Sequence, residues 1–220
     1  MNSLPSEFLE IAQMISEYSQ LCWNRGFVEA NGGNISVRLP GNLLISTPSM
    51  RSKNNLREYD MVISNFLGEK IYGSGDASSE LTTHIAIYMS NPDAAAVIHT
   101  HPPYTCSYAF TNSLPLDGLS PESVIWTERV GVIPYLLPGS VELYEEVLKA
   151  SERTEVLLLR NHGLITWGKN LREAWWRTEV MENNCRISHY ITERGDIANK
   201  ISKEQISLLK TRYGLNSTEK

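Results

Sequence analysis

Three of the five histidines in this 220-residue sequence stand at the ends of apolar segments. His99 and His101 are two residues apart, so on a β-strand both imidazoles project from the same face. His162 follows a second apolar run, in a tight turn that Gly163 permits. Three imidazoles with one open position are typical of a catalytic zinc ion. The competing interpretation is two hydrogen-bonded histidines at a strand end and one exposed histidine in a turn.

A run of small and polar residues at 73–80 precedes an expected helix over 81–89. The hydroxyl groups of Ser78 and Ser79, together with the unpaired N–H groups of a helix N-terminus, can bind an anion. Glu80 ends this run, where its carboxylate could reach the reacting carbons of a bound phosphate ester. The competing interpretation is an ordinary helix cap, with a glutamate that the helix dipole favours in the first turn.

Two further segments carry groups that bind anions. In 31–34 two successive glycines, the second of them Gly33, let neighbouring N–H groups point into one concavity. At the far end of the expected hairpin, Thr47 and Ser49 add hydroxyl donors. Both segments also fit ordinary turns, so neither identifies a site by itself.

The spacing of apolar residues predicts the elements that must hold these side chains. The expected helices cover 5–26, 81–89, 104–110, 141–149, 171–191 and 203–213, and the expected strands cover 34–39, 42–47, 61–64, 70–72, 94–100, 130–137, 155–159 and 164–167. Because helices alternate with strands that often form hairpins, we expect a layered α/β fold with a mixed sheet. No repeat or long linker interrupts the chain, so we expect one domain over 1–220, with a C-terminal tail at about 203–220.

Composition argues against several classes of protein. Hydrophobic residues make up 41% of the chain and charged residues 20%, which is enough apolar material for a full core. The net charge is −5 and no long Lys/Arg run occurs, so we expect no nucleic-acid partner. No apolar stretch approaches the roughly 20 residues that cross a bilayer, so we expect no membrane partner. The start of the chain lacks a signal-peptide pattern and the three cysteines are widely spaced, which favours a cytoplasmic location.

Taken together, these motifs resemble the class II aldolase/adducin family, most closely its L-fuculose-phosphate aldolase branch. The motifs follow the family's order over about residues 5–190, and the tail Tyr213-Gly214-Leu215 is also similar to the end of the fuculose-phosphate enzymes. The segments that carry the resemblance are Gly33-Asn34-Ile35-Ser36-Val37-Arg38, Ser46-Thr47-Pro48-Ser49, Ser78-Ser79-Glu80, Ala96-Val97-Ile98-His99-Thr100-His101-Pro102 and Leu157-Leu158-Leu159-Arg160-Asn161-His162-Gly163-Leu164.

The resemblance implies a single three-layer α/β/α domain around a mixed, largely antiparallel sheet. It implies a homotetramer with active sites at the subunit contacts. It also implies one zinc ion per subunit on His99, His101 and His162, with Glu80 as proton carrier and candidate fourth ligand. The residues that the resemblance assigns to the substrate phosphate are Gly33, Asn34, Ser49, Met50, Ser78 and Ser79.

The implied reaction is cleavage of a ketose 1-phosphate, by retro-aldol chemistry, to dihydroxyacetone phosphate and an aldehyde. Zinc acts as the Lewis acid and Glu80 exchanges the proton. A decarboxylase of a 3-keto sugar-acid phosphate, a dehydratase or an epimerase could use the same site, although the epimerase branch resembles Ser-Ser-Asp rather than Ser-Ser-Glu. An adducin-like interaction module keeps the fold but lacks the metal ligands, all of which this chain has.

Three positions depart from the family's pattern. Met50 stands where the phosphate loop usually has glycine, and Asn31 stands where threonine is common. No tyrosine occurs in 111–124, where the fuculose-phosphate enzymes have the tyrosine that acts in a neighbouring subunit's site. We therefore expect another residue to serve as the second acid. The leading candidate is Tyr213, whose competing role is to pack the tail, and the others are Asp117 and Glu122.

Overall fold

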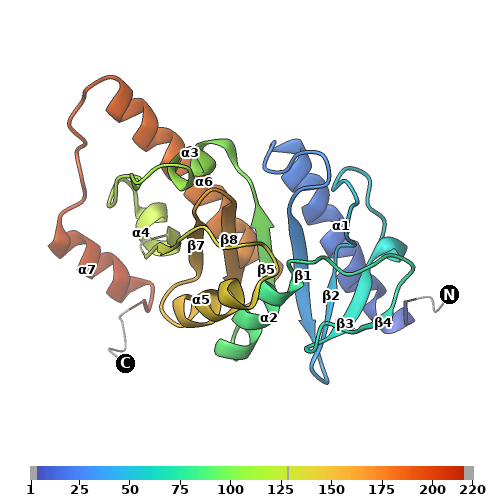
Figure 1. Ribbon diagram of the computed structural model, residues 1–220. Helices are drawn as coiled ribbons and strands as arrows, with labels where there is room; N and C mark the ends of the chain where they lie inside the picture. The colour runs from blue at the N-terminus through green and yellow to red at the C-terminus, as the bar shows by residue number, and fades with distance from the viewer. Residues whose placement is uncertain (1–3, 128, 216–220) are drawn as a thin grey trace.

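Among the residues that the computed structural model describes, 4–127 and 129–215, eight strands form one sheet (Figure 1). The strands are β1 (Asn34–Leu39), β2 (Leu43–Ser46), β3 (Val62–Asn65), β4 (Lys70–Tyr72), β5 (Ala96–Thr100), β6 (Gly131–Ile133), β7 (Val156–Leu159) and β8 (Gly163–Gly168). Their order is β4-β3-β2-β1-β5-β8-β7-β6, and every neighbouring pair is antiparallel except β6 and β7. The predicted mixed, largely antiparallel sheet is confirmed.

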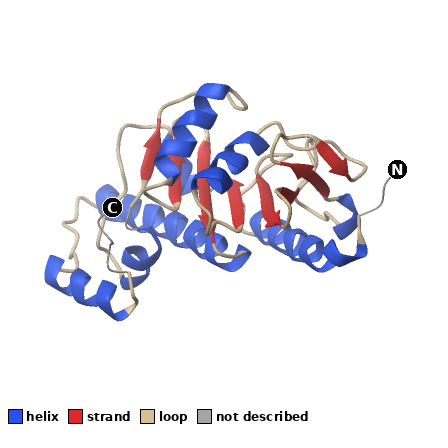
Figure 2. Cartoon of the chain, turned by 90° about the horizontal axis from the view of Figure 1, so that it is seen from below, coloured by secondary structure: helices blue, strands red, loops and turns tan. Residues whose placement is uncertain are grey.

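Helices cover both faces of this sheet. Those of the described ranges are α1 (Leu9–Asn24), α2 (Leu81–Ser90), α3 (Pro103–Ala109), α4 (Pro121–Thr127), α5 (Val141–Ser151), α6 (Leu171–Glu193) and α7 (Lys203–Arg212), with 3-10 turns at Ser6–Phe8 and Glu58–Asp60. Buried side chains of α1 and α6 pack on one face, and those of α2 and α5 pack on the other. Figure 2 shows the strands between these helices. The predicted three-layer α/β/α arrangement is confirmed.

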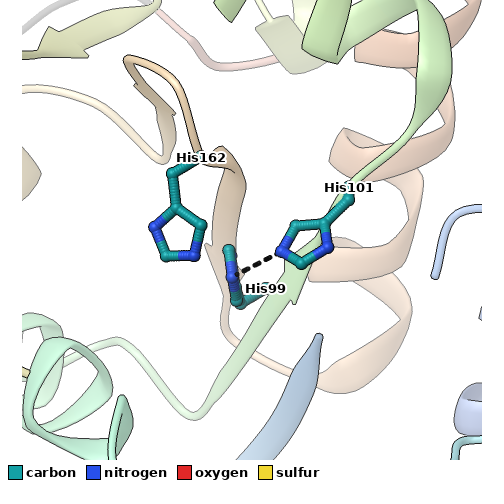
Figure 3. Close-up of side chains that lie close together, drawn as sticks. All are labelled: His99, His101 and His162. Atoms are coloured by element: carbon teal, nitrogen blue, oxygen red, sulfur yellow. Dashed lines mark hydrogen bonds between the residues drawn. The ribbon is translucent and has the colours of Figure 1, made fainter. Parts of the chain in front are cut away.

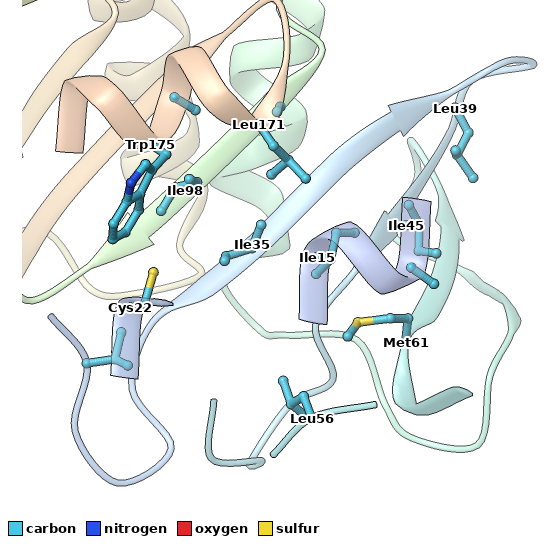
Figure 4. Packing of buried hydrophobic residues seen from close by; sticks show 14 of the residues in the cluster. Ile15, Cys22, Ile35, Leu39, Ile45, Leu56, Met61, Ile98, Leu171 and Trp175 are labelled. Atoms are coloured by element: carbon cyan, nitrogen blue, oxygen red, sulfur yellow. The ribbon is translucent and has the colours of Figure 1, made fainter. Parts of the chain in front are cut away.

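Alternation along β5 decides which side chains enter each layer. Ile98 lies in the core that α1 and α6 cover, together with Trp175 of α6 (Figure 4). Val97 points to the opposite face, into the core beneath α2 and α5. His99 is two residues beyond Val97, so it lies on the face that α2 covers. Asn34 of β1 is its direct partner in the antiparallel register.

Two elements differ from the sequence-based expectation. The strand expected over 130–137 is only Gly131–Ile133, because Pro134 has no N–H with which to extend the ladder to β7. The apolar spacing also does not predict α4, which follows Ser120. The hydroxyl of Ser120 accepts a hydrogen bond from the N–H of Ser123 at 3.1 Å, and a proline occupies the first helical position. A capping serine followed by proline is therefore the signal that indicates this helix.

The described part of the C-terminal tail consists of α7 and the three residues after it, while residues 216–220 lie outside the described residues. Helix α7 packs against α4, at the end of the molecule away from β1–β4 (Figure 1). No helix within the described ranges combines the length and the hydropathy needed to cross a membrane.

Candidate active site

The three histidines predicted as metal ligands lie together, where β5 ends and where β7 turns into β8 (Figure 3). One nitrogen from each ring lies within 4.8 Å of the others. His99 is buried, whereas His101 and His162 are half-buried, so the group is accessible from one side. Antiparallel pairing of β5 with β8 brings together residues that are about sixty positions apart in the sequence.

A glycine allows the turn that carries His162 to approach β5. At Gly163 a Cβ atom would lie 2.6 Å from the carbonyl oxygen of Thr100 and 2.7 Å from the ring of His101. Asn161, in the same turn, has a φ of 54°, in the left-handed region that asparagine tolerates. Any other residue at position 163 would therefore push His162 away from the other two histidines.

Hydrogen bonds to the outer ring nitrogens determine how two of the imidazoles point. Nδ1 of His99 donates to the carbonyl oxygen of Leu164 at 3.0 Å, and Nδ1 of His101 donates to the carboxylate of Glu29 at 2.9 Å. Because both partners are acceptors, each ring carries its proton on Nδ1 and leaves a lone pair on Nε2. The two Nε2 atoms face each other at 3.2 Å. This tautomer is the one in which Nε2 can bind a metal ion.

Glu80 lies directly before α2 and faces the histidines. Its Oε1 is 2.9 Å from Nε2 of His162, and its Oε2 is 3.4 Å from Nε2 of His99. The side-chain amide of Asn34 donates to Oε2 at 2.9 Å and holds the carboxylate in place. Since Asn34 and His99 are partners across β1 and β5, one ladder positions the carboxylate relative to the buried ring.

Burial and neighbouring groups set the charges at this site. Burial lowers the pKa of His99 well below its usual range, and the carboxylate of Glu80 opposes this shift only in part. For Glu80, burial alone would raise the pKa, but His99, His162 and the hydrogen bond from Asn34 outweigh it and hold the pKa below its usual range. At neutral pH the buried imidazole is therefore neutral and the carboxyl group is ionised. These are the forms that bind a cation.

The donor set fits a divalent metal ion. Three imidazoles with an adjacent carboxylate match the ligands of catalytic sites, and the accessible side leaves room for a substrate oxygen. A cavity of about 660 Å³ lies between α3, α4 and α6, and none of the three histidines lines it. We place the candidate active site at the histidines because the reactive donors converge there, whereas that cavity holds no such group of ligands among the described residues.

The turns that the sequence assigns to anion binding adjoin Glu80. The side-chain amide of Asn34 donates to the hydroxyl of Ser78 at 3.4 Å as well as to Glu80, and that hydroxyl accepts from the N–H of Glu80 at 3.2 Å. Ser79 follows Ser78 directly, at the start of the loop into α2. The side-chain oxygen of Asn34 is buried and has no hydrogen-bond partner among the described residues.

The turn at 47–50 is joined to the loop that precedes α2. The N–H of Ser49 donates to the carbonyl oxygen of Asp76 at 2.8 Å, next to a β-bridge formed by the flanking residues. Met50 has a φ of 54° and is 78% exposed, so methionine occupies a left-handed position that favours glycine. Gly33 has a φ of 68°, and a Cβ atom there would lie 2.8 Å from the carbonyl oxygen of His99. Of the residues predicted to bind the anion, Asn34, Ser49, Ser78 and Ser79 lie in or hydrogen-bond to the loop before α2, while Gly33 and Met50 are the chain neighbours of Asn34 and Ser49.

Two residues at the site are absent from the sequence-based predictions. Glu29 holds the ring of His101, and Lys53 lies buried behind the turns, where it donates to the carbonyl oxygen of Asn31 at 3.0 Å. Glu29 stands just before the Asn-Gly-Gly-Asn turn, and its position near that motif is the only signal that could have indicated it. Lys53 lies in a polar loop segment that gives no sign that its side chain is buried.

The three candidates for the second acid are not joined to the histidines within the described part of this single chain. Tyr213 ends α7 and is 57% exposed. Asp117 pairs with Lys200, and Glu122 lines the cavity between α3, α4 and α6. None of the three forms a hydrogen bond or ion pair with the histidines or Glu80.

Curated proteins with two different names are among the relatives of this chain. A protein of Methanococcus vannielii named L-fuculose phosphate aldolase is 32% identical over 180 residues, which cover 80% of this chain and 96% of that protein. A protein of Pectobacterium atrosepticum named 3-oxo-tetronate 4-phosphate decarboxylase is 31% identical over 197 residues, which cover 87% of this chain and 89% of that protein.

Solved structures and a family model agree with this similarity. A structure titled L-fuculose 1-phosphate aldolase superposes with a TM-score of 0.84 at 25% identity, covering 96% of this chain and 98% of that one. The model of the class II aldolase and adducin N-terminal domain matches residues 13–189. The matched range includes the three histidines, Glu80 and all of the turns described above. The chain therefore belongs to the class II aldolase and adducin N-terminal domain family.

Proposed function

We propose that this protein is a zinc-dependent aldehyde-lyase that cleaves a ketose 1-phosphate into dihydroxyacetone phosphate and an aldehyde by retro-aldol chemistry. The observation that carries the proposal is the convergence of three imidazoles on the carboxylate of Glu80, beside turns suited to an anion. Similarity to proteins named L-fuculose phosphate aldolase supports the same reaction class. Zinc is the proposed ion because imidazole nitrogen suits it, whereas magnesium and calcium prefer oxygen ligands.

In this proposal His99, His101 and His162 would hold the ion, and Glu80 is the candidate fourth ligand. When bound, zinc would polarise the substrate's carbonyl oxygen as a Lewis acid. In the aldol direction the ionised carboxylate of Glu80 would take the proton from the carbon next to that carbonyl, and in the cleavage direction the protonated carboxyl group would return it to that carbon.

The remaining predicted residues hold the charged end of the substrate. The hydroxyls of Ser78, Ser79 and Ser49 and the backbone at Gly33 and Met50 would contact the phosphate, and their contacts stay constant through the reaction. Asn34 has a second role, because its amide donates to Glu80 and so positions the carboxylate that carries the proton.

A second candidate is decarboxylation of a 3-keto sugar-acid phosphate on the same site. Two observations favour it: the similarity to proteins named 3-oxo-tetronate 4-phosphate decarboxylase, and the absence of a tyrosine from 111–124. Loss of carbon dioxide needs no acid to handle an aldehyde oxygen, so the missing tyrosine matters less for this reaction. The ligands, Glu80 and the anion turns would keep their roles.

One experiment separates these reactions. The zinc-loaded protein is incubated with a panel of ketose 1-phosphates and a panel of 3-keto sugar-acid phosphates. We expect dihydroxyacetone phosphate and an aldehyde from the first panel, measured with a coupled dehydrogenase. Carbon dioxide from the second panel alone would replace the lyase proposal by the decarboxylase, and no product from either panel would overturn both.

We also propose a cytoplasmic homotetramer, in which Tyr213 of a neighbouring subunit is the second acid. The exposed position of Tyr213 at the end of α7 leaves it available to another copy. Tyr213→Phe should lower kcat by about 100-fold without changing stability, since one general acid contributes about 10²–10⁴-fold. Deletion of the chain after Lys210 is the companion variant. If Tyr213→Phe is fully active while the deletion destabilises the protein, the tail is structural and Asp117 or Glu122 must be tested.

A further inference from the structure

The anion-binding turns enclose a lysine that the proposed reaction does not use. Lys53 lies in the loop after Met50, and only 2% of it is exposed. Among the residues described, no other lysine or arginine is buried. Removing an ammonium group from water is costly unless it is well paired, so this position needs a physical reason.

Backbone oxygens satisfy this ammonium group only in part. Nζ of Lys53 donates to the carbonyl oxygen of Asn31 at 3.0 Å and to that of Arg51 at 2.9 Å. An ammonium group has three N–H donors, so these two hydrogen bonds leave its third N–H without a partner among the described residues. No carboxylate in the described ranges forms an ion pair with it, although other lysines of the chain, such as Lys70 and Lys149, have such partners.

Burial lowers the pKa of Lys53 to about 8. The groups that face it are Cys22 from α1, Glu80 at the start of α2 and Glu29 before the first turn, and the two carboxylates oppose this shift at neutral pH. The lysine is therefore largely protonated at neutral pH. It carries a buried positive charge with no counter-ion in contact.

The two carbonyl groups belong to the two turns that form the anion pocket. Asn31 begins the turn that contains Gly33, and Arg51 directly follows Met50. Lys53 thus joins both turns, of which the first also donates through Asn34 to Ser78 and Glu80 and the second donates through Ser49 to Asp76 in the same loop.

We propose that Lys53 is a positioning residue that joins the 31–34 and 49–51 turns into one anion pocket. Its ammonium group places a buried positive charge behind that pocket. This charge favours a doubly charged oxyanion such as a phosphate ester. This inference rests on the proposed sugar-phosphate function. An oxyanion in the pocket supplies the counter-charge that the lysine lacks, so a dianionic substrate gains more than a monoanionic or neutral one. Lys53 therefore discriminates between substrates by their charge more than by their shape.

The test uses sulfate binding to the metal-free full-length protein, measured by titration calorimetry after chelation. Sulfate is suitable because it stays doubly charged across the pH range used. Lys53→Met should weaken sulfate binding by about tenfold or more, which corresponds to about 1.4 kcal/mol. Lys149→Met is the matched control, since it removes the same charge from an exposed position on α5, and it should leave sulfate affinity unchanged.

The pH dependence and a second variant separate charge from packing. Wild-type affinity for sulfate should fall as the pH rises through about 8, whereas Lys53→Met should show no such fall. The thiol of Cys22, whose pKa burial raises to about 12, stays neutral over this range. Lys53→Gln keeps a donor for the backbone without the charge, and it should bind sulfate as poorly as Lys53→Met. If Lys53→Met does not fold, Lys53→Gln alone tests whether the charge is needed for sulfate binding.

The outcomes distinguish this inference from the proposed function. If wild type binds sulfate and both Lys53 variants bind it equally well, Lys53 is only a structural link and the inference is overturned. If wild type binds neither sulfate nor inorganic phosphate, the anion pocket itself is wrong, and the sugar-phosphate proposal fails with it.

Discussion

The histidine group and the turns proposed to bind an anion adjoin each other, but different contacts position them. His99 is held by a continuous antiparallel ladder, with Asn34 on one side and Ile165 on the other. The turns instead depend on left-handed backbone at Gly33 and Met50, and on a few hydrogen bonds from side chains. In the first part His99 lies on the central strand β5, while His101 follows that strand and His162 stands in the turn between β7 and β8; the second part lies entirely in connections between elements.

This difference indicates how the two parts divide the chemistry. A metal group tolerates little displacement of its ligands, and a central strand supplies the required rigidity. An anion pocket relies on N–H and hydroxyl donors, which turns and helix starts present naturally. We therefore expect changes in the histidine group to abolish the reaction, and changes in the turns to weaken substrate binding in steps.

The largest expected effect is that of His162→Ala on metal content. Residues that only support a ligand change metal affinity by about 10–100-fold, so loss of a ligand should cost about 100-fold or more and remove nearly all turnover. Zinc per chain after dialysis, measured by atomic spectroscopy, is the readout. His189→Ala, at an exposed position on α6, is the control and should keep its zinc. Full occupancy in His162→Ala would remove this residue from the ligand set.

Glu80→Gln should have the next largest effect. Glutamine keeps an oxygen for the amide of Asn34 but cannot carry the proton, so kcat should fall by about 10²–10⁴-fold. Sulfate binding to the metal-free variant should stay within about twofold of wild type, because Glu80 belongs functionally with the histidines. Activity within a few-fold of wild type would contradict the role of Glu80 as proton carrier. Loss of sulfate binding together with activity would contradict the division between the histidine group and the turns.

Ser78→Ala and Ser79→Ala should have intermediate effects. Each removes a hydrogen bond to a charged group, worth about 1–3 kcal/mol, so KM for a phosphorylated substrate should rise by about 5–150-fold with little change in kcat. The matching unphosphorylated sugar is the control substrate, and its KM should not change. Equal changes for both substrates would mean that these serines do not bind a phosphate.

The smallest expected effect is that of Met50→Gly. The left-handed conformation costs a non-glycine residue about 1 kcal/mol, while glycine loses more backbone entropy on folding. The net change in the free energy of unfolding, measured with urea, should therefore stay within about 1 kcal/mol, and substrate KM should fall slightly as the backbone becomes accessible. A clear loss of stability would contradict this expectation and would indicate that the methionine side chain, whose sulfur accepts from the amide of Asn31 at 3.4 Å, holds the two turns together.

Much of the scaffold was predictable because it depends on local patterns. The apolar runs around His99 and His162 predict strands, and the Pro-Gly pair predicts the hairpin between β1 and β2. The strand expected over 130–137 was predicted too long, because apolar character alone does not show where pairing with β7 stops. Helix α4 was missed although Ser120 and the proline after it mark its start.

The sequence by itself determined which residue types could meet: histidines at strand ends, a glutamate before a helix, and glycines where the backbone must come close. Only the tertiary structure decided their partners, namely Asn34 on Glu80, Glu29 on His101 and Lys53 beneath the turns. The physical reason is that residue types and period-two spacing are local properties. Which strand lies beside which depends on the whole sheet, where β5 lies between β1 and β8 although neither is its neighbour in the chain.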